Sequence, residues 1–156
     1  MKIKIIALGK IKEKFLKDGV DEFIKRLTPY TSIEIVELTP IEIKDENLIQ
    51  KALEQEGEKI LSNIKPDSYV ITLEILGKQL SSEDFASKIN EITNSGISEL
   101  VFVIGSSCGL SQTVSQRADF KLSISKMTFL HQFARLLLVE QIYRAFKILK
   151  NETYHK

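Results

Sequence analysis

Hydrophobic and polar positions along the chain fall into blocks that predict strands and helices in turn. Short runs of β-branched and other apolar residues, each bounded by Gly, Pro or polar residues, are typical of strands. Four runs fit this description: 3–8, 33–38, 69–73 and 100–104. A weaker run over 122–125 predicts a fifth strand.

Between the strands, apolar residues recur every three or four positions, which predicts helices. Such helices are expected over 12–27, over about 45–64 with an acidic surface, and from Ser81 onward. A short helix should follow Ser111. The last helix, over about 130–149, is apolar on most of its circumference and therefore needs burial on several sides.

This alternation of strands and helices predicts an α/β fold with a largely parallel sheet in a single domain, residues 1–156. Ligands of open α/β sheets bind beyond the carboxyl ends of the strands. Strand ends in the second half of the chain are therefore the expected binding region. They are residues 73–77, 104–109 and 124–129.

Composition narrows the class of protein. The chain has 156 residues, of which 43% are hydrophobic and 28% are charged, as in ordinary globular proteins. Its one cysteine, Cys108, excludes an internal disulfide framework and a multi-cysteine zinc cluster. No apolar run approaches the roughly 18 residues of a membrane span, and no signal-peptide pattern opens the chain. We expect a soluble, cytoplasmic protein without a membrane partner.

The formal net charge of +1 conceals an uneven distribution. Residues 1–28 carry eight basic and four acidic side chains, and residues 131–156 carry five and two, whereas residues 29–60 carry three and eight. If the two basic ends share one side of the fold, they favour a phosphate-bearing partner. Two separate solvated helix faces would explain the same pattern.

Few individual residues indicate a particular catalytic or metal-binding chemistry. The loop 105–109 lacks both the G-x-G-x-x-G spacing and the P-loop lysine. Its small residues either let a ligand approach the backbone closely or form a tight strand-to-helix turn. Cys108 has no recognisable partners of a catalytic thiol. His131 and His155 lie 24 positions apart without other ligands at metal spacing, which argues against a metal site. Arg135, within the apolar helix, requires an acidic or phosphate partner.

Several ordered blocks of residues together resemble a known family over the full length. The blocks are 1–10, 70–78, 102–105, 123–128, 139–146 and the terminal Tyr154-His155-Lys156. They resemble the SPOUT-class methyltransferases that modify N3 of a pseudouridine in large-subunit (23S) rRNA. The resemblance implies that the α/β sheet carries a deep trefoil knot formed by the C-terminal segment, a rare exception to ordinary connectivity.

The resemblance also implies a cofactor and an assembly. Members bind S-adenosylmethionine in the knot loops as homodimers, with the partner's C-terminal tail beside the cofactor. Carried over position by position, the cofactor contacts are Leu73, Gly105, Ile124, Ser125, Lys126, Met127, Thr128 and Phe129. These positions coincide with the three strand ends that the topology selects.

The implied substrate is a pseudouridine of 23S rRNA in the assembled ribosome, whose imide N–H must lose its proton before it can accept a methyl group. We expect His131, Arg135, Tyr154 and His155 to position the base and to stabilise or accept this charge. Which of them is the general base stays open. Basic side chains expected to contact phosphates are Lys10, Lys12, Lys14, Lys17, Lys147, Lys150 and Lys156.

Departures from the family pattern leave alternatives open. Ser106 stands where a second glycine is usual, Leu130 where a proline is usual, and Lys150-Asn151 where Arg-Gly is frequent. A non-enzymatic ribosome- or RNA-binding homologue, or a methyltransferase with a shifted target nucleotide, would fit these changes. A dinucleotide-dependent oxidoreductase is disfavoured because the Rossmann fingerprint is absent. The acidic helix over 45–64 receives no functional role.

Overall fold

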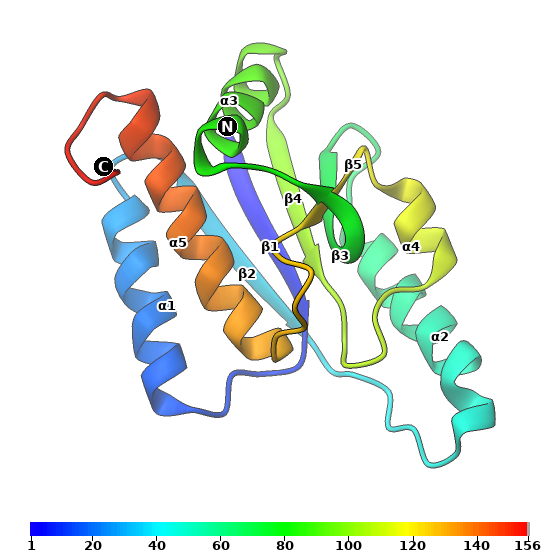
Figure 1. The fold of residues 1–156 in the computed structure, drawn as a ribbon. Helices are drawn as coiled ribbons and strands as arrows, with labels where there is room; N and C mark the ends of the chain where they lie inside the picture. The colour runs from blue at the N-terminus through cyan, green and yellow to red at the C-terminus, as the bar shows by residue number, and fades with distance from the viewer. Residues whose placement is uncertain (156) are drawn as a thin grey trace.

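A computed structural model of the chain, which describes residues 1–155, has strands and helices alternating along the sequence (Figure 1). The strands are β1 (Lys2–Leu8), β2 (Ser32–Leu38), β3 (Tyr69–Gln79), β4 (Glu99–Ile104) and β5 (Phe120–Ser123). The helices are α1 (Lys14–Leu27), α2 (Ile49–Ser62), α3 (Ser82–Asn94), α4 (Gln112–Arg117) and α5 (His131–Leu149), with a 3₁₀ turn at Glu46–Leu48. The strands form one parallel sheet of order β2-β1-β4-β3-β5, which confirms the predicted α/β fold.

Helices cover both faces of this sheet, and the alternating side chains of its strands supply two cores. Helices α1, α3 and α5 lie on one face and α2 and α4 on the other (Figure 1). In β1, Ile5 belongs to the core beneath α1, α3 and α5, whereas Ile6 belongs to the core beneath α2 and α4. Strands β1 and β4 are buried on both faces, which explains their continuous apolar sequences.

Because all five strands are parallel, their carboxyl ends lie along one side of the sheet. We call this side the carboxyl edge; it consists of the residues that directly follow Leu8, Leu38, Leu73, Ile104 and Ser123. The start of β1 and the residues that follow α5, up to position 155, lie on the opposite side in Figure 1. No helix within residues 1–155 is long and apolar enough to cross a membrane.

Strand β3 differs from the sequence prediction, which ended it at Leu73. It pairs with β5 from Ile71↔Phe120 to Leu73↔Leu122, leaves the ladder for four residues, and pairs again at Lys78↔Leu122 and Gln79↔Ser123. Gly77 sits where a Cβ atom would lie only 2.7 Å from the carbonyl oxygen of Lys121. The chain of β3 therefore closes around β5 at a backbone-to-backbone contact that only glycine allows. The knot implied by the resemblance stays a prediction.

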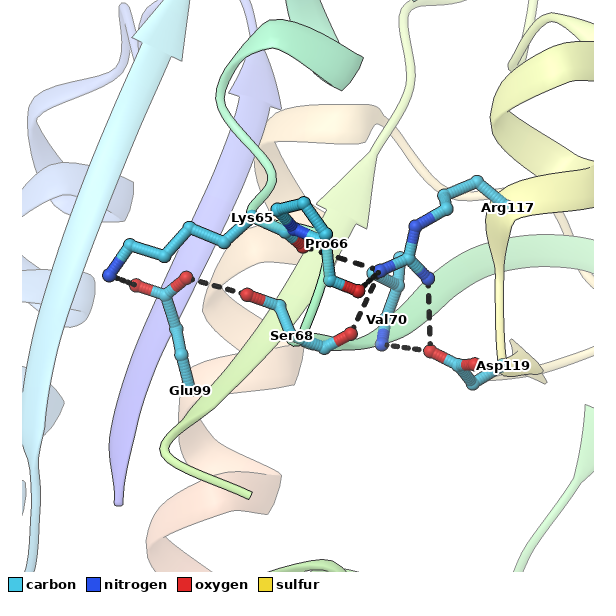
Figure 2. Close-up of polar contacts among 7 residues, drawn as sticks. All are labelled: Lys65, Pro66, Ser68, Val70, Glu99, Arg117 and Asp119. Carbon is cyan, nitrogen blue, oxygen red and sulfur yellow. Dashed lines mark hydrogen bonds and ion pairs between the residues drawn. The ribbon is translucent and has the colours of Figure 1, made fainter.

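A polar network ties the other end of β3 to its neighbours (Figure 2). Arg117 donates to the carbonyl oxygens of Pro66 and Ser68 at 3.2 and 2.9 Å, and pairs with Asp119. Ser68 Oγ donates to the buried carboxylate of Glu99 at 2.8 Å. Figure 2 also shows Lys65 directed at Glu99, and Lys4 pairs with the same carboxylate.

This network lowers the pKa of Glu99 although burial alone would raise it, because the Ser68 hydroxyl and the charge of Lys4 favour the carboxylate. The charged groups are thus compensated inside the fold. The network holds the connection between α2 and β3 and so fixes the register of β3 beside β4 and β5.

Replacing Gly77 by Ala should destabilise the fold, because the new Cβ would collide with backbone atoms of Lys121 and Leu122 that have no rotamer to change. We expect the free energy of unfolding, measured by urea denaturation, to fall by about 1–3 kcal/mol. Leu76→Ala, at a side chain that is 98% exposed, is the neighbouring control and should change it by less than about 0.5 kcal/mol. Equal stability of both variants would contradict the close contact.

Candidate active site

Three adjacent strands bring the predicted cofactor residues to one part of the carboxyl edge. Leu73 pairs with Leu122 of β5, and Thr72 pairs with Val103 of β4. Gly105 directly follows β4, and Ile124 directly follows β5. Since neighbouring strands are about 4.8 Å apart, the backbones at the three strand ends are within reach of a single small ligand.

The segment from Ile124 to Leu130 exposes apolar side chains at this edge. Met127 is 75% exposed, and Ile124 and Phe129 are each just over one third exposed. The turn is held by local bonds, because Ser123 Oγ donates to the Ser125 carbonyl and the N–H of Met127 donates to Ser125 Oγ. An ordered turn with uncovered apolar groups can contact a flat, largely apolar ligand.

Gly105 and Ser106 begin the loop after β4. A Cβ at Gly105 would lie 2.5 Å from the carbonyl oxygen of Gly109, so the loop closes tightly on itself there. Ser106, the departure from the usual glycine, donates its hydroxyl to Glu56 Oε2 of α2 at 3.1 Å. Glu56 is 2% exposed and also accepts from the N–H of Ile41. The acidic helix thereby acquires a role, which is to anchor the loop that carries Gly105.

Leu130, the second departure, lies directly before α5. Its φ of −55° is close to the value that a proline would impose at this position. Its side chain is 74% exposed. The backbone therefore enters α5 in the same direction that proline would favour, although leucine does not lock it.

His131, the first residue of α5, packs against the turn that follows β1. Its Nε2 is 3.6 Å from the place where a Cβ of Gly9 would be, and Gly9 has a φ of +92°. In the same turn, the N–H of Lys12 donates to the side chain of Gln132 at 2.8 Å. Burial, and to a lesser extent the positive charges of Arg135 and Lys12, lower the pKa of His131. The imidazole is therefore neutral at neutral pH.

Arg135 lies one helical turn further along α5 and is almost fully buried, with 2% exposure. Its guanidinium donates to Glu37 Oε2 at 2.7 Å and to the carbonyl oxygen of Gly9 at 2.9 Å, which supplies the acidic partner that the sequence required. Its Nε is buried without a partner among residues 1–155. The contacts join α5 to the ends of β1 and β2, and the structure thus brings His131 and Arg135 together.

Tyr154 and His155 do not join them within one chain. Both follow the far end of α5, whose 19 residues span about 27 Å. Tyr154 donates to Glu140 Oε1 at 3.0 Å, and His155 Nε2 lies 2.7 Å from Glu83 Oε1 of α3. Burial, followed by the bond to Glu140, raises the pKa of Tyr154, so its hydroxyl keeps its proton. The four predicted catalytic residues form two pairs at opposite ends of α5.

The predicted basic surface is divided in the same way. Lys10 and Lys12 lie in the turn beside His131, whereas Lys147 and Lys150 lie near the far end of α5. Three of the predicted lysines form ion pairs with acidic side chains: Lys14 with Asp18, Lys17 with Asp21 and Lys147 with Glu152. Lys156 lies outside the described residues.

Sequence reasoning missed the carboxylates that hold these side chains in place. Glu37, Glu56, Glu83 and Glu140 contact Arg135, Ser106, His155 and Tyr154 respectively. Three of these pairs are separated by 50 or more positions. Only the Glu140–Tyr154 pair is closer in the sequence. A buried arginine in the last helix was the one signal that an acidic partner was needed.

Comparisons with known proteins give a consistent result. The family described as "Predicted SPOUT methyltransferase" matches residues 1–155. A relative from Methanococcus maripaludis, named "Putative ribosomal RNA large subunit methyltransferase H", is 51% identical over the full length of both chains. A solved structure of "a probable methylase family protein" from Haemophilus influenzae matches 96% of this chain and 66% of its own, with 13% identity and a TM-score of 0.54. This last likeness concerns the fold alone.

The environment of His131 leads to a titration experiment. Lys12→Gln removes one of the positive charges that lower the pKa of His131, so this pKa should rise toward its ordinary value. Lys14→Gln, at an exposed lysine paired with Asp18, is the control and should leave it unchanged. NMR titration of the ring protons measures both.

The lowered pKa of His131 also makes the free energy of unfolding depend on pH. Because the folded state binds the His131 proton less readily than the unfolded state, this group lowers the free energy of unfolding as the pH falls below the ordinary histidine pKa. A His131 pKa at or above the ordinary value would contradict the burial described.

Proposed function

Because this chain belongs to the SPOUT methyltransferase family, we propose that it transfers a methyl group from S-adenosylmethionine to N3 of a pseudouridine in 23S rRNA of the assembled ribosome. The observation that carries the proposal is the meeting of Leu73, Gly105 and the segment 124–129 at one part of the carboxyl edge. The relative of 51% identity bears a name that specifies large-subunit rRNA. A ribosomal substrate places the activity in the cytoplasm.

The residues at this edge fit the chemistry of the cofactor. Leu73, Ile124 and Met127 offer apolar and polarizable surface for an adenine ring and a sulfonium group. Backbone groups of the loops at Gly105 and Ser125 can bond the polar edges of the base and ribose. When bound, S-adenosylmethionine supplies an electrophilic methyl group; the side chains need only position the acceptor and handle its proton.

The pseudouridine imide must lose its N–H proton, and we assign a different role in this step to each site residue. Tyr154 keeps its own proton, which it donates to Glu140 in the free chain and can donate to the base by turning away from that carboxylate. His131 is neutral and begins α5 directly after the segment 124–130. Arg135 is enclosed by Glu37 and Gly9, so it acts by holding His131 and α5 in place.

A second copy of the chain completes the site. Tyr154 and His155 lie about 27 Å from His131 along α5, too far to share one base within a chain. The segment near the start of α5 leaves apolar side chains uncovered at Met127, Leu130 and Phe133, as an interface requires. A homodimer in which this uncovered segment of one copy packs against the tail end of α5 of the other would place the tail of one copy beside the cofactor loops of its partner.

A methyl-transfer assay tests this function. Purified protein and labelled S-adenosylmethionine, added to ribosomes from cells without an enzyme of this class, should place label on N3 of one pseudouridine of 23S rRNA. His155→Ala should reduce the rate by about 100-fold while leaving cofactor affinity unchanged, because the tail acts on the base. Thr153→Ala, at an exposed tail position, is the control and should retain full activity.

The alternatives give different results in the same assay. Label on another nucleotide would identify a shifted target. Binding of the cofactor without transfer to ribosomes would point to another RNA substrate. A protein that binds ribosomes without binding S-adenosylmethionine would be the non-enzymatic homologue, and would contradict the proposal.

A further inference from the structure

The C-terminal tail, residues 151–155, is held by contacts that the methyltransferase function does not by itself explain. The ring of Tyr154 packs edge-on against Tyr143 at 4.8 Å between centroids, and the guanidinium of Arg144 lies 4.7 Å from the Tyr154 ring. Arg144 also pairs with Glu140 at 2.5 Å. These contacts fix the tail on α5, so His155 is presented in a defined orientation.

His155 lies between two groups of opposite charge. Glu83, in the first turn of α3, has its Oε1 2.7 Å from His155 Nε2. Arg144 of α5 has its Nη1 3.4 Å from His155 Nδ1. These are the charged groups that face the ring; Glu140 and Arg26 act on the neighbouring Tyr154.

The two partners determine where the ring carries its proton. A carboxylate only accepts hydrogen bonds and a guanidinium only donates them. Nε2 must therefore carry the hydrogen that Glu83 accepts, and Nδ1 must present its lone pair to Arg144. At 3.4 Å the contact with Arg144 is at the long limit of a hydrogen bond, so a better donor can replace it.

We propose that Glu83 is a positioning residue that fixes His155 with hydrogen on Nε2, so that Nδ1 accepts the imide proton of the substrate base. In this step the N–H bond of the imide breaks, its electron pair stays on nitrogen, and the proton bonds to Nδ1. The carboxylate of Glu83 offsets the positive charge that the ring gains. The inference rests on the proposed function, since it assigns the proton acceptor for that reaction.

Glu83 is suited to this role because it stays ionised. A backbone hydrogen bond at the start of α3, and then the bond to His155, lower the pKa of Glu83. The side chain is 62% exposed, whereas that of His155 is 27% exposed. An ion pair this exposed contributes little to folding, so Glu83 can be changed without loss of the fold.

The experiment compares Glu83→Gln with Asp84→Asn in the full-length protein. Both variants remove one negative charge from the first turn of α3, but of these two carboxylates only Glu83 bonds to His155. Glutamine can still accept the Nε2 hydrogen but carries no charge. The ¹⁵N shifts of the His155 ring, and the dependence of kcat on pH with ribosomes as substrate, are measured for each variant.

In Glu83→Gln the dependence of kcat on pH should differ from that of the wild type, because the carboxylate no longer offsets the positive charge that the ring gains. We expect kcat to fall about 10-fold. The KM for ribosomes should stay unchanged, because the substitution alters the partner of the His155 ring and not the surface that binds ribosomes. Asp84→Asn should change neither kcat nor its dependence on pH.

Two outcomes would overturn the inference. One is a kcat profile in Glu83→Gln that matches that of Asp84→Asn. The other is a neutral His155 ring in the wild-type protein with its hydrogen on Nδ1, which the ¹⁵N shifts report whatever the variants do. Absence of methyl transfer by the wild type would instead refute the proposed function, while the tautomer would still decide the role of Glu83.

Discussion

The double pairing of β3 with β5 is the constraint on which the candidate site depends. By leaving the ladder after Leu73 and rejoining it at Lys78, both opposite Leu122, β3 loops out over residues 74–77 beside the last residues of β5, from which the segment 124–130 continues. The close passage at Gly77 leaves no space for a side chain between the two backbones. With β4 paired on the other side of β3, the three strand ends are aligned by backbone hydrogen bonds. A cofactor site built this way needs few dedicated side chains, which agrees with the absence of a glycine-rich fingerprint.

Helix α5 connects this edge to the tail. At its start, the buried Arg135 joins it to Gly9 and Glu37 and so sets the place of His131. At its end, the tail folds back onto the same helix, where Glu83 and Glu140 hold His155 and Tyr154. The helix is rigid between these ends, so no local motion can bring the tail to the edge of its own chain. The separation makes a second copy a requirement of the proposed chemistry.

The periodicity of apolar residues was enough to predict the order of strands and helices, because burial dictates it residue by residue. It could not predict that β3 continues to Gln79, since residues 74–79 lack a buried apolar run and only Lys78 and Gln79 pair again with β5. The Glu37–Arg135 and Glu83–His155 contacts join positions 98 and 72 residues apart and leave no periodic signal. Resemblance to a family supplied the cofactor residues, whereas the structure supplied the contacts that position them.

Complementation in a mixed dimer tests most directly whether the site is shared between two copies. One subunit carries His155→Ala with intact cofactor loops; the other carries Gly105→Ala, whose Cβ would collide with the Gly109 carbonyl, with an intact tail. Each variant alone should be inactive toward ribosomes. The mixed dimer should recover about half of the wild-type activity, since one of its two sites combines an intact loop with an intact tail. A mixed dimer no more active than its parents would contradict the shared site.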